Sequence, residues 1–171
     1  EAGRARVLAA VESIRERLPG VRVHVDARDE RPGWKYNEWE MRGVPLRMEV
    51  GPRDVDAGTV VLARRDSGEK VTVPLEGVDS STSQLLDDIQ ATLLAQAADR
   101  LSANTAWAAD YGELKALMDR TSVAYAYWDG TSEDEGRFQD ETGGTIRCLP
   151  FDVPGGTGRC VLTGRETGRV A

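Results

Sequence analysis

Acidic, basic and aromatic side chains alternate closely in the stretch between Asp26 and Arg53. A carboxylate can accept the N–H donors of a guanine edge, a basic group can donate to its O6 and N7 atoms, and an aromatic ring can stack on an unpaired base. The residues with these capacities are Arg28, Asp29, Glu30, Arg31, Trp34, Lys35, Glu38, Glu40 and Arg53. A solvated surface with internal ion pairs has the same pattern, and such pairs contribute little. The charge pattern alone leaves a binding surface and an ordinary exposed surface open.

The sequence carries no motif of a catalytic centre. His24 is the only histidine, and it alternates with Val23 and Val25, which places it on one face of a predicted strand. No Ser, Cys or metal partner lies nearby in sequence, and neither a phosphate-binding glycine loop nor a nucleophile motif is present. We therefore favour a binding module without a catalytic centre of its own.

The distribution of charge is more informative than its total. The formal net charge of −7 argues against binding nucleic acid through bulk charge. Basic residues are nevertheless concentrated between Arg22 and Lys70, whereas the acidic excess falls mainly after residue 75. The negative total is thus compatible with a local basic surface in the first half.

The number of cysteines and the hydropathy of the chain indicate its cellular compartment. No apolar run is long enough to span a bilayer, and the N-terminus lacks the pattern of a signal peptide. Cys148 and Cys160 are the only cysteines, too few for a disulfide framework or a four-cysteine zinc site. We expect a cytoplasmic protein with reduced thiols, one of them buried.

The elements that must position the Asp26–Arg53 residues predict an α/β fold. The expected order is a helix over 7–18, a strand over 21–25, a short helix over 34–42, strands over 46–50, 59–63 and 70–74, and a long helix over 86–101. Ser80 or Ser81 is the predicted N-cap of the long helix. These elements indicate a mixed sheet flanked by helices.

The remaining chain predicts a small α+β domain, so that the expected domains are residues 1–103 and 104–171. A helix over 111–118 and a strand over 123–128 precede the acidic stretch 133–135 and a glycine-rich end. The side chains expected to pack this domain are Tyr125, Tyr127, Trp128, Phe138, Leu149 and Phe151.

Residues 26–54 resemble the anticodon-binding domain of class II aminoacyl-tRNA synthetases, and within that group the prolyl-tRNA synthetases of archaeal and eukaryotic type. The resemblance rests on the W-K-x-x-x-W-E-x-x-G-V-P block at 34–45, the G-P-R-D motif at 51–54 and Arg64-Arg65-Asp66 before the predicted hairpin. It continues through 85–90, 125–130 and 147–151, and so covers nearly the whole chain.

The resemblance implies that this chain reads the anticodon loop of proline tRNA, whose anticodons share two guanines. The nine residues named first are then the anticodon-binding candidates, with Arg53 near the phosphates. Trp39 is expected to pack inward, and Asp26 and Asp54 to serve as turn or cap residues. The parent enzyme would ligate proline to tRNA with ATP and magnesium in a catalytic domain of the same polypeptide, as a homodimer. No cofactor is expected in this chain.

The same resemblance concerns metal binding in the tail. Relatives carry zinc cysteines in W-C-G and C-x-x-C-G contexts, whereas this chain has Asp129 after Trp128 and Thr163 three residues after Cys160. Zinc would be left with too few thiolates for a structural site. We expect no zinc, and a small domain held together by packing alone.

Two alternatives stay open at this point. The family's anticodon-binding domain usually opens with a strand before its first helix, whereas this chain begins within the helix, so we expect a fragment whose sheet has an open edge. A stand-alone paralogue that binds RNA or protein without aminoacylation would share these features. A threonyl, glycyl or histidyl enzyme would share the fold, but the W-K-x-x-x-W-E block and the tail argue against it.

Overall fold

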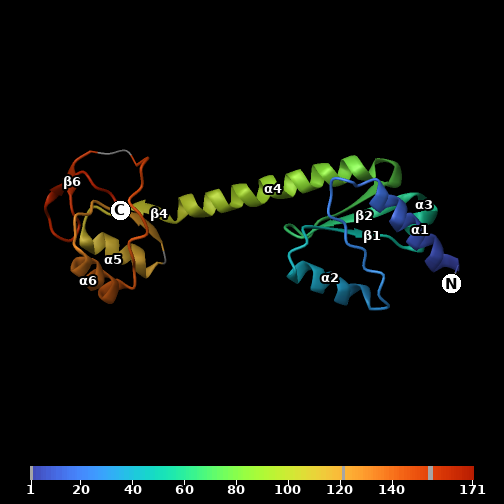
Figure 1. Cartoon of the computed structure of the whole chain (residues 1–171), viewed down its shortest axis with the longest axis horizontal. Helices are drawn as coiled ribbons and strands as arrows, with labels where there is room; N and C mark the ends of the chain where they lie inside the picture. Colours follow the sequence, from blue (N-terminus) through green and yellow to red (C-terminus); the bar gives the residue numbers. More distant parts are fainter. Residues whose placement is uncertain (1, 121, 154–155) are drawn as a thin grey trace. The chain divides into compact units, whose positions relative to one another are not determined.

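The computed structural model describes residues 2–120, 122–153 and 156–171 (Figure 1). It divides into two compact units, the first ending at Ala95 and the second beginning at Gln96. This division lies within the long helix α4 (Val78–Ala103), whereas the domain boundary was predicted after its end, between residues 103 and 104. None of the helices that the structure describes is long and apolar enough to cross a membrane.

The first unit is built around a three-stranded antiparallel sheet of order β1-β2-β3. Its elements in chain order are α1 (Ala2–Glu16), α2 (Pro32–Met41), β1 (Leu46–Glu49), α3 (Pro52–Ala57), β2 (Thr59–Arg64), β3 (Lys70–Pro74), the 3₁₀ turn η1 (Leu75–Gly77) and the first part of α4. These elements confirm the predicted α/β class, the hairpin and all but one of the predicted strands. The short helix α3 was not predicted.

Each face of the sheet meets different helices. Leu46 and Met48 of β1 pack with Leu62 of β2 and with Ile14 and Val78 from α1 and α4, which makes one continuous apolar core. The opposite face carries Arg47, whose guanidinium lies over the Tyr36 ring of α2. Figure 1 shows α2 and α4 on opposite sides of the strands.

The strand predicted over residues 21–25 is wrong. The alternation that suggested it is present, because Val21 and Val23 pack against the core while Arg22 and His24 are exposed. No ladder joins this segment to another strand among the described residues. A groove of about 360 Å³ lies between it and β1. The described sheet is therefore antiparallel and not mixed: alternation reports a buried face, but a strand also needs a neighbouring backbone.

The start of α4 also differs from the prediction. The 3₁₀ turn leads directly into the helix at Val78, so Ser80 and Ser81 lie within the first turn instead of capping it. The Ser80 hydroxyl donates to the Gly77 carbonyl at 3.0 Å.

The second unit contains a parallel strand pair joined through a helix. β4 (Thr105–Trp107) pairs with β5 (Val123–Tyr125), α5 (Tyr111–Asp119) connects them, and α6 (Ser132–Thr142) follows. A short hairpin of β6 (Gly158–Arg159) and β7 (Glu166–Thr167) precedes the bridge from Tyr127 to Val170. The acidic stretch 133–135 forms the first turn of α6, where negative charge is favourable.

The core of the second unit contains part of the predicted set. Trp128, Phe138 and Cys160 are buried together with Leu114 of α5. Leu149 is 44% exposed and Phe151 is fully exposed, so neither belongs to the buried core and the prediction that these two pack the domain is wrong. Cys148 is exposed and Cys160 is buried, which confirms the prediction for the two free thiols.

Candidate nucleic-acid interface

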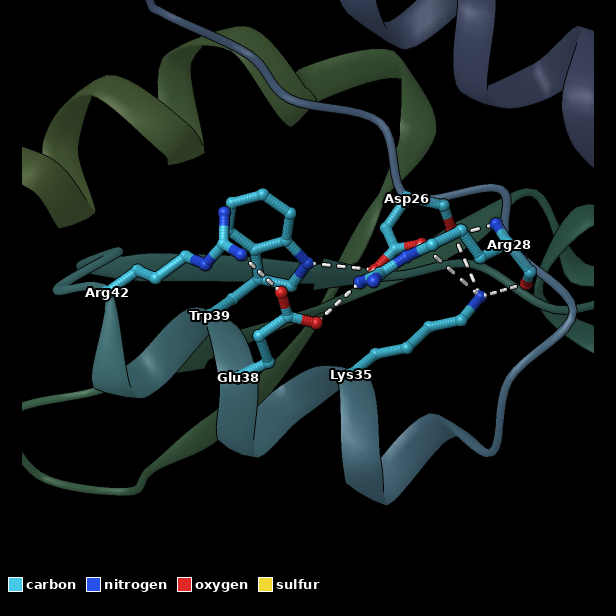
Figure 2. Close-up of polar contacts among 6 residues, drawn as sticks. All are labelled: Asp26, Arg28, Lys35, Glu38, Trp39 and Arg42. Carbon is cyan, nitrogen blue, oxygen red and sulfur yellow. Dashed lines mark hydrogen bonds and ion pairs between the residues drawn. The ribbon is translucent and has the colours of Figure 1, made fainter.

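The candidate interface is formed by the segment 26–31 and the helix α2 that follows it. Arg31, in extended conformation, is the N-cap residue, and Pro32 occupies the first turn, where its fixed φ favours helix initiation. Side chains three or four residues apart lie on one face of a helix. In α2 and at its C-cap these are Lys35, Glu38, Trp39 and Arg42. Figure 2 shows this face turned toward Asp26 and Arg28.

Asp26 is the acceptor at the centre of this arrangement. Its carboxylate accepts hydrogen bonds from Arg28 Nε at 2.9 Å, Arg28 Nη2 at 2.6 Å and Trp39 Nε1 at 2.8 Å. The Asp26 side chain is only 12% exposed. The bonds from Arg28, followed by the bond from Trp39, hold the pKa of the Asp26 carboxyl well below its usual range. Asp26 therefore stays ionised and fixes the turn that carries Arg28.

Glu38 joins this turn to the end of α2. Its carboxylate accepts from Arg28 Nη2 at 2.7 Å and from Arg42 Nη2 at 2.6 Å. Lys35 Nζ donates to the backbone carbonyls of Asp26 and Arg28. Two carboxylates thus face three cations, and the network has a net charge of about +1 (Figure 2).

Glu40 belongs to a second network, on β1. It pairs with Arg47, which also pairs with Glu49 at 3.0 Å and lies 4.0 Å from the centre of the Tyr36 ring. Lys70 of β3 pairs with Glu49 at 2.8 Å. Glu40 is therefore directed toward the sheet and away from Arg28, Lys35 and Glu38.

The other predicted site residues are exposed. Asp29, Glu30 and Arg31 form a short run on the surface, and their side chains make no hydrogen bond or ion pair to the described residues. Trp34 is 53% exposed, and the Arg28 guanidinium lies 5.2 Å from its ring centre. The side chains of Asp29, Glu30 and Arg31 can contact a ligand without first breaking an internal pair among the described residues.

Arg53 lies apart in sequence, in the first turn of α3. The Asp54 carboxylate accepts from the Gly51 backbone N–H at 2.8 Å and so fixes the start of this helix, which confirms the capping role predicted for Asp54. The Arg53 side chain is exposed and has no ion-pair partner within the described ranges. It is accessible to a phosphate.

Sequence reasoning missed two parts of this interface. Arg42 was not singled out, although its spacing of four from Glu38 is the usual one for a helical ion pair. The role of Asp26 as the common acceptor for Arg28 and Trp39 was also missed. Trp39 packs inward as predicted, with its ring 4.2 Å from that of His24.

The fold and the interface agree with comparisons to known protein families. Residues 2–82 match the family model described as the anticodon binding domain. Residues 111–171 match the model described as prolyl-tRNA synthetase, C-terminal. The first unit is thus an anticodon-binding domain, and the second unit matches a separate family model, that of the prolyl-tRNA synthetase C-terminal domain.

Similar sequences extend across the junction of the two units. A proline--tRNA ligase of Chloroflexus aurantiacus is 47% identical over 97% of this chain, and one of Roseiflexus sp. is 44% identical over 98%. The chloroplastic/mitochondrial proline--tRNA ligase of Arabidopsis thaliana is 41% identical over 96%. The chain belongs to the prolyl-tRNA synthetase family, which confirms the predicted resemblance, and it matches the C-terminal region of that family. It spans about a third of the length of these relatives: 35%, 36% and 32%.

Proposed function

We propose that this chain recognises the anticodon of proline tRNA as the C-terminal part of a proline–tRNA ligase. The observation that carries the proposal is the exposed Trp34 ring with the Arg28 guanidinium over it, in an anticodon-binding domain. Beside it lies the exposed run 29–31, whose side chains make no ion pair with the part of the chain that the structure describes. An unstacked base of a tRNA loop can stack on such a ring.

The nine predicted residues then divide into two roles. Asp29, Glu30 and Arg31 supply acceptors and a donor for base edges, Trp34 supplies the stacking surface, and Arg53 neutralises a phosphate. Four of the nine are already bonded within the protein and act by holding the reading groups in place: Arg28, Lys35, Glu38 and Glu40. A frame fixed before binding lowers the cost of ordering it in the complex.

The activity of the parent enzyme is part of the same proposal. It would ligate proline to tRNA with ATP and magnesium, through the part of the relatives that this chain does not match. Its partners would be proline tRNA, the catalytic domain of the same polypeptide and a second subunit. We propose the cytoplasm as its compartment, although the Arabidopsis relative is named for organelles.

The direct test is binding of the 171-residue chain to an anticodon stem-loop of proline tRNA, followed by fluorescence anisotropy at several salt concentrations. Replacing either shared guanine is expected to cost about 1–3 kcal/mol, or roughly 5- to 150-fold in Kd. Arg31→Glu should weaken binding and make its dependence on salt less steep.

Arg159→Glu provides the matched control, because it makes the same charge change on an exposed strand residue of the second unit. It is expected to leave discrimination between guanines unchanged. Equal binding to every loop, or no binding, would refute anticodon reading and favour a stand-alone interaction module.

A further inference from the structure

The second unit holds a polar cluster that the proposed function does not use. One carboxylate oxygen of Asp129 accepts from the Thr163 hydroxyl at 2.6 Å, and the other accepts from Arg165 Nε at 2.7 Å. Arg165 Nη2 also donates to the Asp129 carbonyl at 3.2 Å. The Asp129 backbone N–H donates to Cys160 Sγ at 3.4 Å. Four side chains thus connect the turn after Trp128 to the turn of the β6–β7 hairpin.

The family resemblance puts zinc cysteines at three of these positions, 129, 160 and 163, and the residues present do not fit a zinc ion. Cys160 is the only thiol of the cluster, and both oxygens of the Asp129 carboxylate are occupied. The Thr163 hydroxyl donates to Asp129 and accepts from the Arg165 backbone N–H at 3.3 Å. Among the described residues, no group of three or more His, Cys, Asp or Glu side chains is placed to hold a metal ion. A structural zinc site uses four strong ligands.

We propose that Asp129, Cys160, Thr163 and Arg165 form a metal-independent clasp, in which the guanidinium of Arg165 supplies the positive charge that a divalent ion would otherwise supply. The clasp joins two turns whose neighbouring backbone is also linked, by the hydrogen bond from the Val161 N–H to the Tyr127 carbonyl. The strands β6 and β7 have only two residues each. The turn between them depends on Gly164, whose φ of 72° favours glycine.

The charges around the clasp support this assignment. Asp134 of α6 lies near Arg165, and its negative charge, like that of Asp129, favours the charged form of the Arg165 guanidinium. The bond from Arg165, ahead of that from Thr163, lowers the pKa of the Asp129 carboxyl, and Asp129 in turn raises the pKa of the Arg165 guanidinium. The pair stays ionised at neutral pH. Cys160 is 2% exposed and packs with Trp128 and Phe138, so the clasp adjoins the core of the unit.

The first test measures metal and stability in the whole chain, purified under reducing conditions. Elemental analysis is expected to find zinc far below one equivalent, and EDTA is expected to leave the thermal unfolding of the second unit unchanged. Zinc bound at one equivalent, or a fall in Tm on adding EDTA, would overturn the proposal.

A double-mutant cycle tests the pair itself. Asp129→Asn and Arg165→Gln are each expected to lower the Tm of the second unit, and the double variant is expected to be no less stable than the worse single variant. The matched control pairs Arg159→Gln with Glu166→Gln, which lie opposite each other on the same hairpin. These two changes are expected to have small, additive effects. Additive losses at Asp129 and Arg165 would contradict the clasp.

A gain of metal binding provides an independent check. The triple variant D129C/T163C/R165S puts three thiols, including Cys160, at positions that the structure brings together, and removes the guanidinium. It is expected to bind zinc near one equivalent, detected by displacement with a chromogenic chelator. If this variant binds no more zinc than the unaltered chain, the positions do not converge and the proposal fails.

Discussion

Two tryptophans of α2, five residues apart, allow the proposed interface to be separated from the folding of its frame. Trp34 is 53% exposed and contacts Arg28, whereas Trp39 is half-buried against His24 and donates to Asp26. We compare Trp34→Ala with Trp39→Ala. The first removes a candidate stacking surface and the second removes a packed ring, while residue type and helix are the same.

The expected magnitudes differ in kind. Loss of one base–aromatic stack costs about 1–3 kcal/mol, so Trp34→Ala should raise Kd by roughly 5- to 150-fold. Its effect on the free energy of unfolding should stay within about 0.5 kcal/mol, as for other exposed sites. Trp39→Ala should lower that free energy by about 3 kcal/mol, the lower end for truncation of a buried aromatic ring, because Trp39 is only half-buried.

Stem-loop binding and urea unfolding of both variants provide the assay. Stacking releases no counterions, so Trp34→Ala should shift the plot of log Kd against log salt without changing its slope. If Trp34→Ala leaves Kd unchanged, or weakens binding only as far as it destabilises the fold, then Trp34 is not a stacking surface.

The remaining predictions concern stability and thiol access. Leu62→Ala removes a fully buried core side chain and should destabilise the first unit by about 2–5 kcal/mol, measured by urea unfolding. The pKa values of Asp26 and Asp129 are lowered in the folded state, so their contributions are complete above about pH 4 and should be lost as pH falls further. Acid unfolding that is unchanged in Asp26→Asn and Asp129→Asn would contradict this. Cys148 is exposed and Cys160 buried; a thiol reagent should therefore label one thiol at once and the second only on unfolding.

Sequence pattern was sufficient to predict features that depend on a single helix or strand. The sequence predicted a short helix over 34–42, and α2 spans Pro32–Met41. On such a helix Trp34, Tyr36 and Trp39 cannot share one face, so at least one ring was expected to point inward. The distribution of partners could not be read from sequence. Glu38 pairs with Arg28, whereas Glu40 pairs with Arg47. This choice of partners depends on the position of β1 beside α2, which the sequence does not report.

Apolar residues were less reliable guides when their neighbours were distant in sequence. Val21 and Val23 do reach the core, yet their backbone has no ladder within the described ranges. Phe151 was expected to pack and is fully exposed. Hydrophobicity thus indicated burial correctly for Val21 and Val23 but not for Phe151. Neither the absence of a paired strand nor the absence of a packing partner is reported by a local pattern.

The groove beside β1 has a consequence for hydrogen exchange along that strand. Arg65 donates its backbone N–H to the Pro45 carbonyl, so these two residues form a hydrogen-bonded pair. In an antiparallel ladder such pairs alternate along the strand, so the amides of Arg47 and Glu49 point to β2. The amides of Leu46 and Met48 then point to the groove. Exchange rates should alternate along β1, with Arg47 slow and Met48 fast. An extended segment bound in the groove would slow the exchange of the Leu46 and Met48 amides and leave that of Arg47 and Glu49 unchanged. Amide exchange along β1 therefore reports whether the groove is occupied.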